Sequence, residues 1–215
     1  MKMNEYMPPT VVDLFCGCGG FSLGLLKAGY EVVAAVDNST MALATYYCNL
    51  CDENTKIIGE IPHKHAHYFN KPDGYRTHFD EKDRIPPVRA LFCKNILDVT
   101  GWEIMDAADV DTVDLVVGSP PCQSFSKVNM RKKKDDPMDY LLFEFGRVIM
   151  EINPRMFMME NVPPIVQAKL PDGRGLIDTF KEMTGSSDWE LYYEMRGMYP
   201  VDMCEESGRQ CTLPL

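Results

Sequence analysis

The sequence lacks a hydrophobic run of the ~20 residues that a membrane-spanning helix needs. Its amino terminus is short and polar and has no apolar core of a secretory signal. Basic residues are in the minority, with 22 lysines and arginines against 32 aspartates and glutamates, which excludes a surface that is basic throughout. These absences predict a cytoplasmic protein without a membrane partner, in which any contact with a polyanion is local.

Histidine is scarce, and all four copies fall between residues 63 and 78. No histidine therefore follows a predicted strand, which disfavours a cysteine hydrolase. Cys48 and Cys51 form a single C-x-x-C pair, which is at most half of a zinc site even with His63, His65 and His67 nearby. We favour a solvated surface segment and predict no metal. Eight cysteines without a signal sequence indicate free thiols in a reducing compartment.

A length of 215 residues, 45% of them hydrophobic, suits one domain. Short apolar runs alternate with helical stripes, which predicts an α/β domain with a mostly parallel sheet and helices on both faces. Strands are predicted at 11–16, 31–36, 88–93, 114–117, 156–159 and 189–195. Helices are predicted at 21–28, 40–50, 139–152 and 175–183. Residues 52–88 have no clear period, which predicts an irregular inserted loop.

One cysteine stands out by its surroundings. The predicted strand 114–117 runs into Gly118 and two prolines, which stop the strand and hold Cys122 on a stiff turn at its carboxyl end. Parallel sheets place their chemistry at that edge. A thiol is a strong nucleophile only when ionised, and a loop rich in free amides favours ionisation. The alternative is a buried cysteine that acts as a small hydrophobic residue.

A second group of residues suggests nucleoside binding. The first predicted strand enters a turn that contains Gly17, Gly19 and Gly20, and the second strand ends at Asp37. Glycines let a backbone approach a nucleotide closely, and an acid at this strand end can accept hydrogen bonds from ribose hydroxyls. Asp37 could instead cap the next helix, or Ser39 could cap it while Asp37 binds. Ser22 replaces the third glycine of the dinucleotide fingerprint, which disfavours a dinucleotide oxidoreductase.

Three further features follow predicted strands or the Cys122 turn. Asn95 lies where its amide could meet an adenine edge, although asparagine also favours turns. Glu160 repeats the Cys122 design, as a reactive side chain at a strand end next to proline, and could donate a proton. The basic run 131–134 could hold phosphates or could simply be solvated.

In this order, the segments 13–24, 120–126 and 160–162 resemble the cofactor loop, the catalytic loop and the acidic motif of the cytosine-5 DNA methyltransferase family. The resemblance covers roughly residues 10–195 and implies a Rossmann-like sheet that binds S-adenosylmethionine. The cofactor-binding residues that it implies are Phe15, Gly17, Gly19, Gly20, Asp37, Asn38, Asn95, Ile96 and Pro121. Asp37 would bind the ribose, whereas Asn38 and Ile96 would contact the adenine faces.

The resemblance also implies a mechanism. Cys122 would add to carbon 6 of a cytosine that has swung out of double-stranded DNA, which makes carbon 5 nucleophilic enough to accept a methyl group. Glu160 would bind or protonate ring nitrogen 3, and Asn161 belongs to the same catalytic motif. The loop that would close on the DNA contains Gln123, Ser126, Arg131, Lys132, Lys133 and Lys134.

The family continues with a Gln-x-Arg-x-Arg strand, a target-recognition region and a returning helix, none of which is visible here. The chain is therefore expected to be a single catalytic unit, 1–215, whose sheet is incomplete at its carboxyl-terminal side. It would act as a truncated chain or as one half of a split bacterial or phage enzyme of restriction-modification, close to the nucleoid. A tRNA cytosine-5 methyltransferase and a non-catalytic S-adenosylmethionine-binding remnant are the alternatives.

Overall fold

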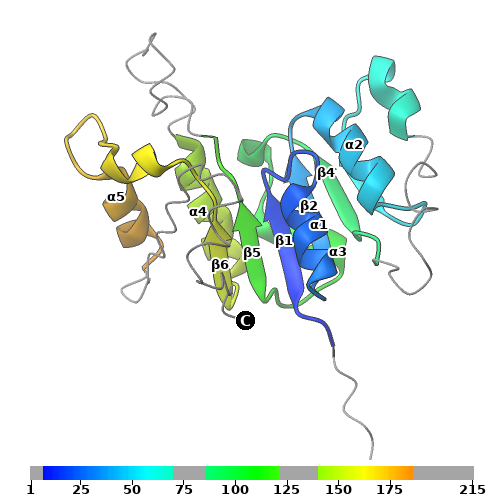
Figure 1. Cartoon of the computed structure of the whole chain (residues 1–215), viewed down its shortest axis with the longest axis horizontal. Coiled ribbons are helices and arrows are strands. Elements are labelled where there is room, and N and C mark those ends of the chain that lie inside the picture. Colours follow the sequence, from blue (N-terminus) through cyan, green and yellow to red (C-terminus); the bar gives the residue numbers. More distant parts are fainter. Residues whose placement is uncertain (1–6, 70–85, 122–139, 186–215) are drawn as a thin grey trace, which may run out of the picture.

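The computed structural model describes residues 7–69, 86–121 and 140–185. The described strands form one six-stranded sheet in the order β3-β4-β2-β1-β5-β6, and each neighbouring pair is parallel (Figure 1). The strands are β1 (Thr10–Leu14), β2 (Glu31–Asp37), β3 (Lys56–Gly59), β4 (Ala90–Cys93), β5 (Leu115–Gly118) and β6 (Met156–Met159). Because all strands run in one direction, their carboxyl ends share one edge, which is the upper edge in Figure 1.

The helices lie on both faces of this sheet, as the sequence predicts. The α-helices are α1 (Gly20–Lys27), α2 (Thr40–Leu50), α3 (Gly101–Ala108), α4 (Leu141–Ile152) and α5 (Leu176–Met183). Helices α1 and α2 pack with one face of the sheet, whereas α3, α4 and α5 pack with the other, so the core consists of two apolar layers. The described part of the chain also contains the short 3-10 helices η1 (His63–Phe69), η4 (Ile96–Asp98) and η6 (Pro163–Gln167). Within the described ranges, no helix is long and apolar enough to cross a bilayer.

The order of the strands fixes where a ligand can bind. The chain adds β2 on one side of β1 and later adds β5 on the other side. Ligands of open parallel sheets bind outside the carboxyl ends of the strands, where the order of addition reverses. The ends of β1, β2 and β5 therefore frame the expected binding site.

The prediction of an irregular loop at 52–88 is wrong for part of that segment. Strand β3 pairs with β4 at the edge of the sheet, and η1 packs beside α2. Strand β3 has only four residues, of which two are exposed, so its stability comes from the pairing with β4 and not from a local apolar pattern. Residues 70–85 of the predicted loop lie outside the described residues.

Helix α3 was not predicted, although the sequence carries a signal for it. The Thr100 hydroxyl accepts a hydrogen bond from the Glu103 backbone N–H at 3.1 Å and caps the helix. Threonine followed three residues later by glutamate is the pattern of a capping box. The helix is only two turns long, so its apolar stripe is short.

Strand β6 occupies the predicted residues but is not buried as expected. Phe157 and Met159 pack against the core, whereas Met156 and Met158 are 58% and 43% exposed. Strand β6 is the described strand at the opposite edge of the sheet from β3, and Met156 and Met158 are exposed on one of its faces. A run of apolar residues cannot show this, because it lacks the alternation that marks a half-exposed strand. The strand predicted at 189–195 lies outside the described residues.

Candidate active site

The glycine turn after β1 has a backbone that most residues cannot adopt. Strand β1 ends at Leu14, two residues earlier than expected, because Phe15 has a φ of 57°. Gly17 and Gly19 follow with φ values of 54° and 95°, and the Gly19 N–H donates to the Cys16 carbonyl at 2.9 Å. Glycine adopts such angles without the clash that a Cβ atom causes. The turn then leads directly into α1.

The turn is closely packed on one side and open on the other. A Cβ atom on Gly19 would lie 2.6 Å from Leu50 Cδ1 and 2.9 Å from Tyr46 Cδ2. A Cβ atom on Gly17 or Gly20 would meet nothing within 4 Å. The backbone of the turn therefore rests on α2 and presents an open face, as a nucleoside cofactor requires.

Asp37 ties the glycine turn to the end of β2. Its Oδ2 accepts from the Gly17 N–H at 2.9 Å, and its Oδ1 accepts from the Ser39 N–H at 2.7 Å. Ser39 caps α2, since its hydroxyl accepts from the Ala42 N–H, as one of the two alternatives expected. A carboxylate has about four lone-pair sites. Two of them therefore remain for further donors, and the binding of ribose hydroxyls by Asp37 stays a prediction.

The residues expected around adenine lie at the end of β4. The Lys94 N–H donates to the Asp37 carbonyl at 3.1 Å, which places this strand end beside that of β2. Asn95 is exposed, and its Oδ1 accepts from the Leu97 N–H at 3.2 Å, so it forms the turn that begins η4. Asn38 is exposed, whereas the Ile96 side chain is only 4% exposed and packs in the core. Their contacts with adenine stay predictions.

A buried polar network beneath the glycine turn was missed by the sequence interpretation. Ser22 on α1 donates to Asp13 Oδ2 at 2.6 Å, and its hydroxyl lies 2.7 Å from that of Tyr46 on α2. All three side chains are fully buried, and Asp13 Oδ1 has no partner. An acid within an apolar strand is a signal for such a network, because a buried polar group needs a partner.

Burial changes the acidity of the groups around this network. Desolvation raises the pKa of Asp13 to about 7, against the opposing effect of the Ser22 hydrogen bond. Burial also raises the pKa of the Cys16 thiol well above its usual value, and Asp13 and Asp37 add to the effect. The pKa of Cys93 is raised by burial and by Asp37. Cys16 and Cys93 are therefore protonated thiols at neutral pH and are poor nucleophiles.

The ends of β5 and β6 lie side by side, as predicted for the strands that precede Cys122 and Glu160. The Glu160 N–H donates to the Gly118 carbonyl at 3.0 Å, and the Glu160 side chain is exposed. Asn161 Nδ2 donates to the Pro120 carbonyl at 3.0 Å and so joins the two motifs. Pro120 is buried and Pro121 is half-buried. The turn before Cys122 is thus fixed to the acidic motif.

The described residues do not include the predicted nucleophile or the loop that follows it. The predicted residues outside the described ranges are Cys122, Gln123, Ser126, Arg131, Lys132, Lys133 and Lys134.

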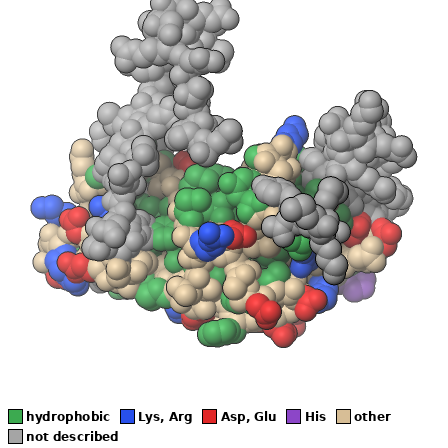
Figure 2. Space-filling model, turned by 90° about the horizontal axis from the view of Figure 1, so that it is seen from below, with side chains coloured by type: hydrophobic (Ala, Val, Ile, Leu, Met, Phe, Trp, Pro, Cys, Tyr) green, Lys and Arg blue, Asp and Glu red, His purple; other side chains and the backbone are tan. Residues whose placement is uncertain are grey.

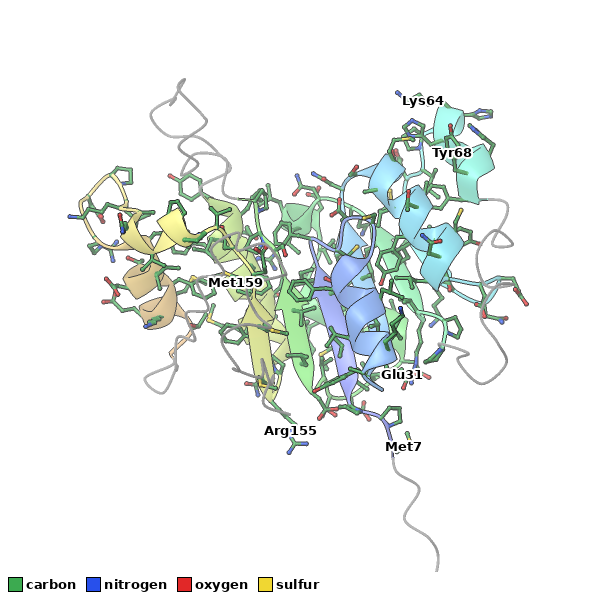
Figure 3. The ribbon with its side chains drawn as sticks, in the orientation of Figure 1. Met7, Glu31, Lys64, Tyr68, Arg155 and Met159 are labelled. Atoms are coloured by element: carbon green, nitrogen blue, oxygen red, sulfur yellow. The ribbon has the colours of Figure 1, made fainter. Side chains whose placement is uncertain are left out.

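Among the described residues, no three histidine, cysteine or acidic side chains gather as metal ligands would. His65 Nδ1 instead lies 2.7 Å from the Thr40 hydroxyl at the start of α2. Segment η1, with Lys64 and Tyr68, lies at the same end of the molecule as the glycine turn (Figure 3).

The family model of C-5 cytosine-specific DNA methylases matches residues 9–75 and 87–195. The chain belongs to this family. The methylase M.XorII of Xanthomonas oryzae, a type II methyltransferase, is 33% identical over 163 residues, which cover 75% of this chain and 30% of M.XorII. The type II methyltransferase M.HgiGI of Herpetosiphon aurantiacus is 30% identical over 153 residues, which cover 70% of this chain and 88% of M.HgiGI.

A solved structure agrees with the fold of the methylase family. It is described as a DNA modification methyltransferase encoded within a prophage of Escherichia coli, and it matches with a TM-score of 0.54 and 25% identity over 82% of this chain. The chain spans 38% of that protein and 30% of M.XorII, which is less than half of either length.

Proposed function

We propose that this chain provides the catalytic and cofactor-binding half of a DNA (cytosine-5-)-methyltransferase that uses S-adenosylmethionine. The observation that carries the proposal is the arrangement of strand ends, in which the glycine turn, Asp37 and the Gly118–Glu160 pair share one edge of a parallel sheet. Figure 2 shows the end of the molecule opposite to this edge, where basic and acidic side chains of described residues are interspersed. Bacterial or phage relatives suggest action in the cytoplasm, where the DNA lies.

The described residues fit the proposed cofactor. The open backbone at Gly17 and Gly20 leaves room for close approach, and the free lone pairs of Asp37 suit ribose hydroxyls. Phe15, Gly19, Asn38, Asn95, Ile96 and Pro121 complete the proposed set around this edge. When bound, S-adenosylmethionine would supply an electrophilic methyl group. The role of the protein would be to bind the cofactor at this edge and to orient it toward the ends of β5 and β6.

The proposed chemistry divides between the two neighbouring strand ends. The Cys122 thiolate adds to carbon 6 of cytosine, and the displaced electron pair makes carbon 5 nucleophilic. Glu160 donates a proton or a hydrogen bond to ring nitrogen 3, where negative charge develops. After carbon 5 is methylated, a base removes its proton and the thiolate leaves. Asn161 holds the carbonyl of Pro120, so it positions the turn that leads to Cys122.

Mechanism-based trapping tests the proposed function. A duplex with 5-fluorocytosine, incubated with the chain and S-adenosylmethionine, is expected to give a covalent complex, because fluorine prevents the final removal of a proton from carbon 5. The complex is detected by denaturing electrophoresis. Cys122→Ser is expected to abolish it, whereas Cys211→Ala is not, because Cys211 lies beyond the residues that the family model matches.

The outcomes of trapping separate the alternatives. Trapping on a 5-fluorocytosine RNA but not on the DNA duplex would indicate an RNA methyltransferase. Binding of the cofactor without trapping, even when a carboxyl-terminal half from a relative is added, would indicate a non-catalytic remnant and contradict the proposal.

We further propose that a second polypeptide covers the exposed face of β6. Met156 and Met158 pair in register with Leu115 and Val117, which are 3% and 0% exposed on the same face of the sheet. Two large apolar side chains beside a buried pair mark a surface that excludes water when a partner binds.

A photo-crosslinker tests this partner. Placed at position 158 in cells, it is expected to join the chain to a polypeptide that mass spectrometry identifies as carrying the family's target-recognition region. Position 150 is the matched control, because Met150 on α4 is similarly exposed, at 46% against 43% for Met158. Crosslinks from position 158 only to residues 186–215 of the chain itself would show that no second polypeptide is needed.

A further inference from the structure

The arginine at the centre of α4 makes more hydrogen bonds than surface arginines usually do. Arg147 Nε donates to Glu144 at 2.7 Å, and Nη1 donates to Glu151 at 2.8 Å. Nη2 donates to two backbone carbonyls, those of Ile96 at 2.9 Å and Val99 at 3.0 Å. The guanidinium has five N–H donors, so four of them are used. The two carboxylates orient the guanidinium, and its Nη2 group donates to the two carbonyls.

These carbonyls belong to the segment that follows β4. Ile96 begins η4, and Val99 is the C-cap residue that follows it. The side chains of both residues are buried, at 4% and 1% exposed. Core packing therefore fixes their side chains, and the hydrogen bonds from Arg147 fix their backbone carbonyls. Its first turn is formed by Asn95, whose Oδ1 accepts from the Leu97 N–H. Arg147 therefore acts on the backbone that presents Asn95 and Ile96 at the cofactor edge.

The same group of side chains connects this segment to a second helix. Glu151 Oε2 accepts from the Gly101 N–H at 2.6 Å at the start of α3, while its Oε1 accepts from Arg147. A Cβ atom on Gly101 would lie 2.7 Å from Glu151 Cβ, so only glycine allows α3 to approach α4 this closely. Helix α4 is also the first described element after the segment that contains Cys122. The Arg147 cluster thus joins the strand end beside the cofactor to the helix that follows the nucleophile.

We propose that Arg147 is a positioning residue for the adenine side of the cofactor site. The inference rests on the proposed function, because it takes the end of β4 as the adenine side. Arg147 touches neither cofactor nor DNA in this role; it holds the carbonyls of Ile96 and Val99 and so fixes the backbone at Asn95. Lysine cannot replace it, since an ammonium group lacks the planar fork that reaches two carboxylates and two carbonyls together.

Ligand binding by the full chain tests this role. Arg147→Met keeps most of the apolar length and removes the donors, and Arg147→Lys keeps the charge. We expect both to weaken binding of S-adenosylmethionine, S-adenosylhomocysteine and adenosine by a similar factor, about tenfold to a hundredfold, in calorimetry well below the unfolding temperature. A similar factor for all three ligands would place the defect at the adenosine end that they share.

Arg155 offers a matched control. It makes one ion pair, with Asp114 at 3.3 Å, and its side chain is 85% exposed. It precedes β6 at the opposite end of the sheet from the cofactor edge (Figure 3). Arg155→Met is expected to leave all three affinities unchanged. A loss of affinity in both variants would indicate general destabilisation and overturn the positioning role.

Hydrogen exchange distinguishes local loosening of the segment after β4 from general destabilisation of the chain. In Arg147→Met, faster exchange is expected at the Asp98 N–H, which donates to the Asn95 carbonyl, whereas the Gly19 N–H in the glycine turn should keep its protection. Affinities and exchange equal to those of the unmodified chain would overturn the inference and leave the proposed function standing. Failure of the unmodified chain to bind any adenosine ligand would overturn both.

Discussion

Replacing Gly19 with alanine is expected to lower the free energy of unfolding by about 2–4 kcal/mol and to abolish binding of S-adenosylmethionine. Two effects add. The φ of 95° places a Cβ atom in a strained conformation, and that atom would lie 2.6 Å from Leu50 Cδ1 and 2.9 Å from Tyr46 Cδ2. Because Tyr46 is fully buried and bound to Ser22, it has little freedom to move away. Chemical denaturation and calorimetry measure the two outcomes.

Two other glycines of the same segment separate these effects. Gly17 shares the positive φ, at 54°, but a Cβ atom there meets nothing within 4 Å, so Gly17→Ala should cost only about 1 kcal/mol. Gly24 lies inside α1 with open space around it, so Gly24→Ala should stabilise the chain by up to about 1 kcal/mol. If Gly19→Ala were no less stable than Gly17→Ala, the contact with Tyr46 and Leu50 would not be restrictive.

The stability of the chain is expected to fall as the pH rises from about 4 to 7, through the titration of Asp13. Its pKa is raised from 3.8 to about 7 in the folded protein because the carboxyl is buried. In this window the unfolded chain has released the proton and the folded protein still holds it, so the folded state binds more protons. Stability that is present below pH 4 is therefore lost as the pH rises through 7, by up to about 4 kcal/mol.

Asp13→Asn isolates this effect, because an amide does not titrate. As the pH rises from 5 to 8, the unfolding free energy of the unmodified chain should fall relative to that of the variant. Denaturation at each pH measures both values. Asp106→Asn is the control, since Asp106 is an exposed carboxyl on α3. Parallel curves for the unmodified chain and Asp13→Asn would contradict the expectation.

The network around Asp13 gives this pH dependence a link to the candidate site. Asp13 precedes the glycine turn, and Ser22 and Tyr46 connect it to α1 and α2, whose packing supports Gly19. Ionisation of a buried carboxylate with one unpartnered oxygen would therefore loosen the elements that shape the turn. The cofactor edge is thus expected to be most rigid at mildly acidic pH.

The sequence by itself determined the local elements and the chemistry at their ends. Apolar runs, glycines and prolines predicted five strands of the described sheet, and the same punctuation placed Asp37 and Glu160 at strand ends. These signals are local, because a strand end is marked by the residues that stop it. The resemblance of three short motifs to the methylase family depends on the same segments.

Only the tertiary structure decided which of these ends meet and what supports them. Three of these features join segments that are distant in the chain: the pairing of β3 with β4, the hydrogen bond from Gly17 to Asp37, and the hydrogen bond from Arg147 to Ile96. The exposure of one face of β6 likewise depends on which elements pack beside it. Such contacts depend on the order in which strands pair and helices pack, and a residue's sequence neighbours do not show that order. These contacts form only when the chain folds, because a local sequence pattern does not identify the distant residue that a group will contact.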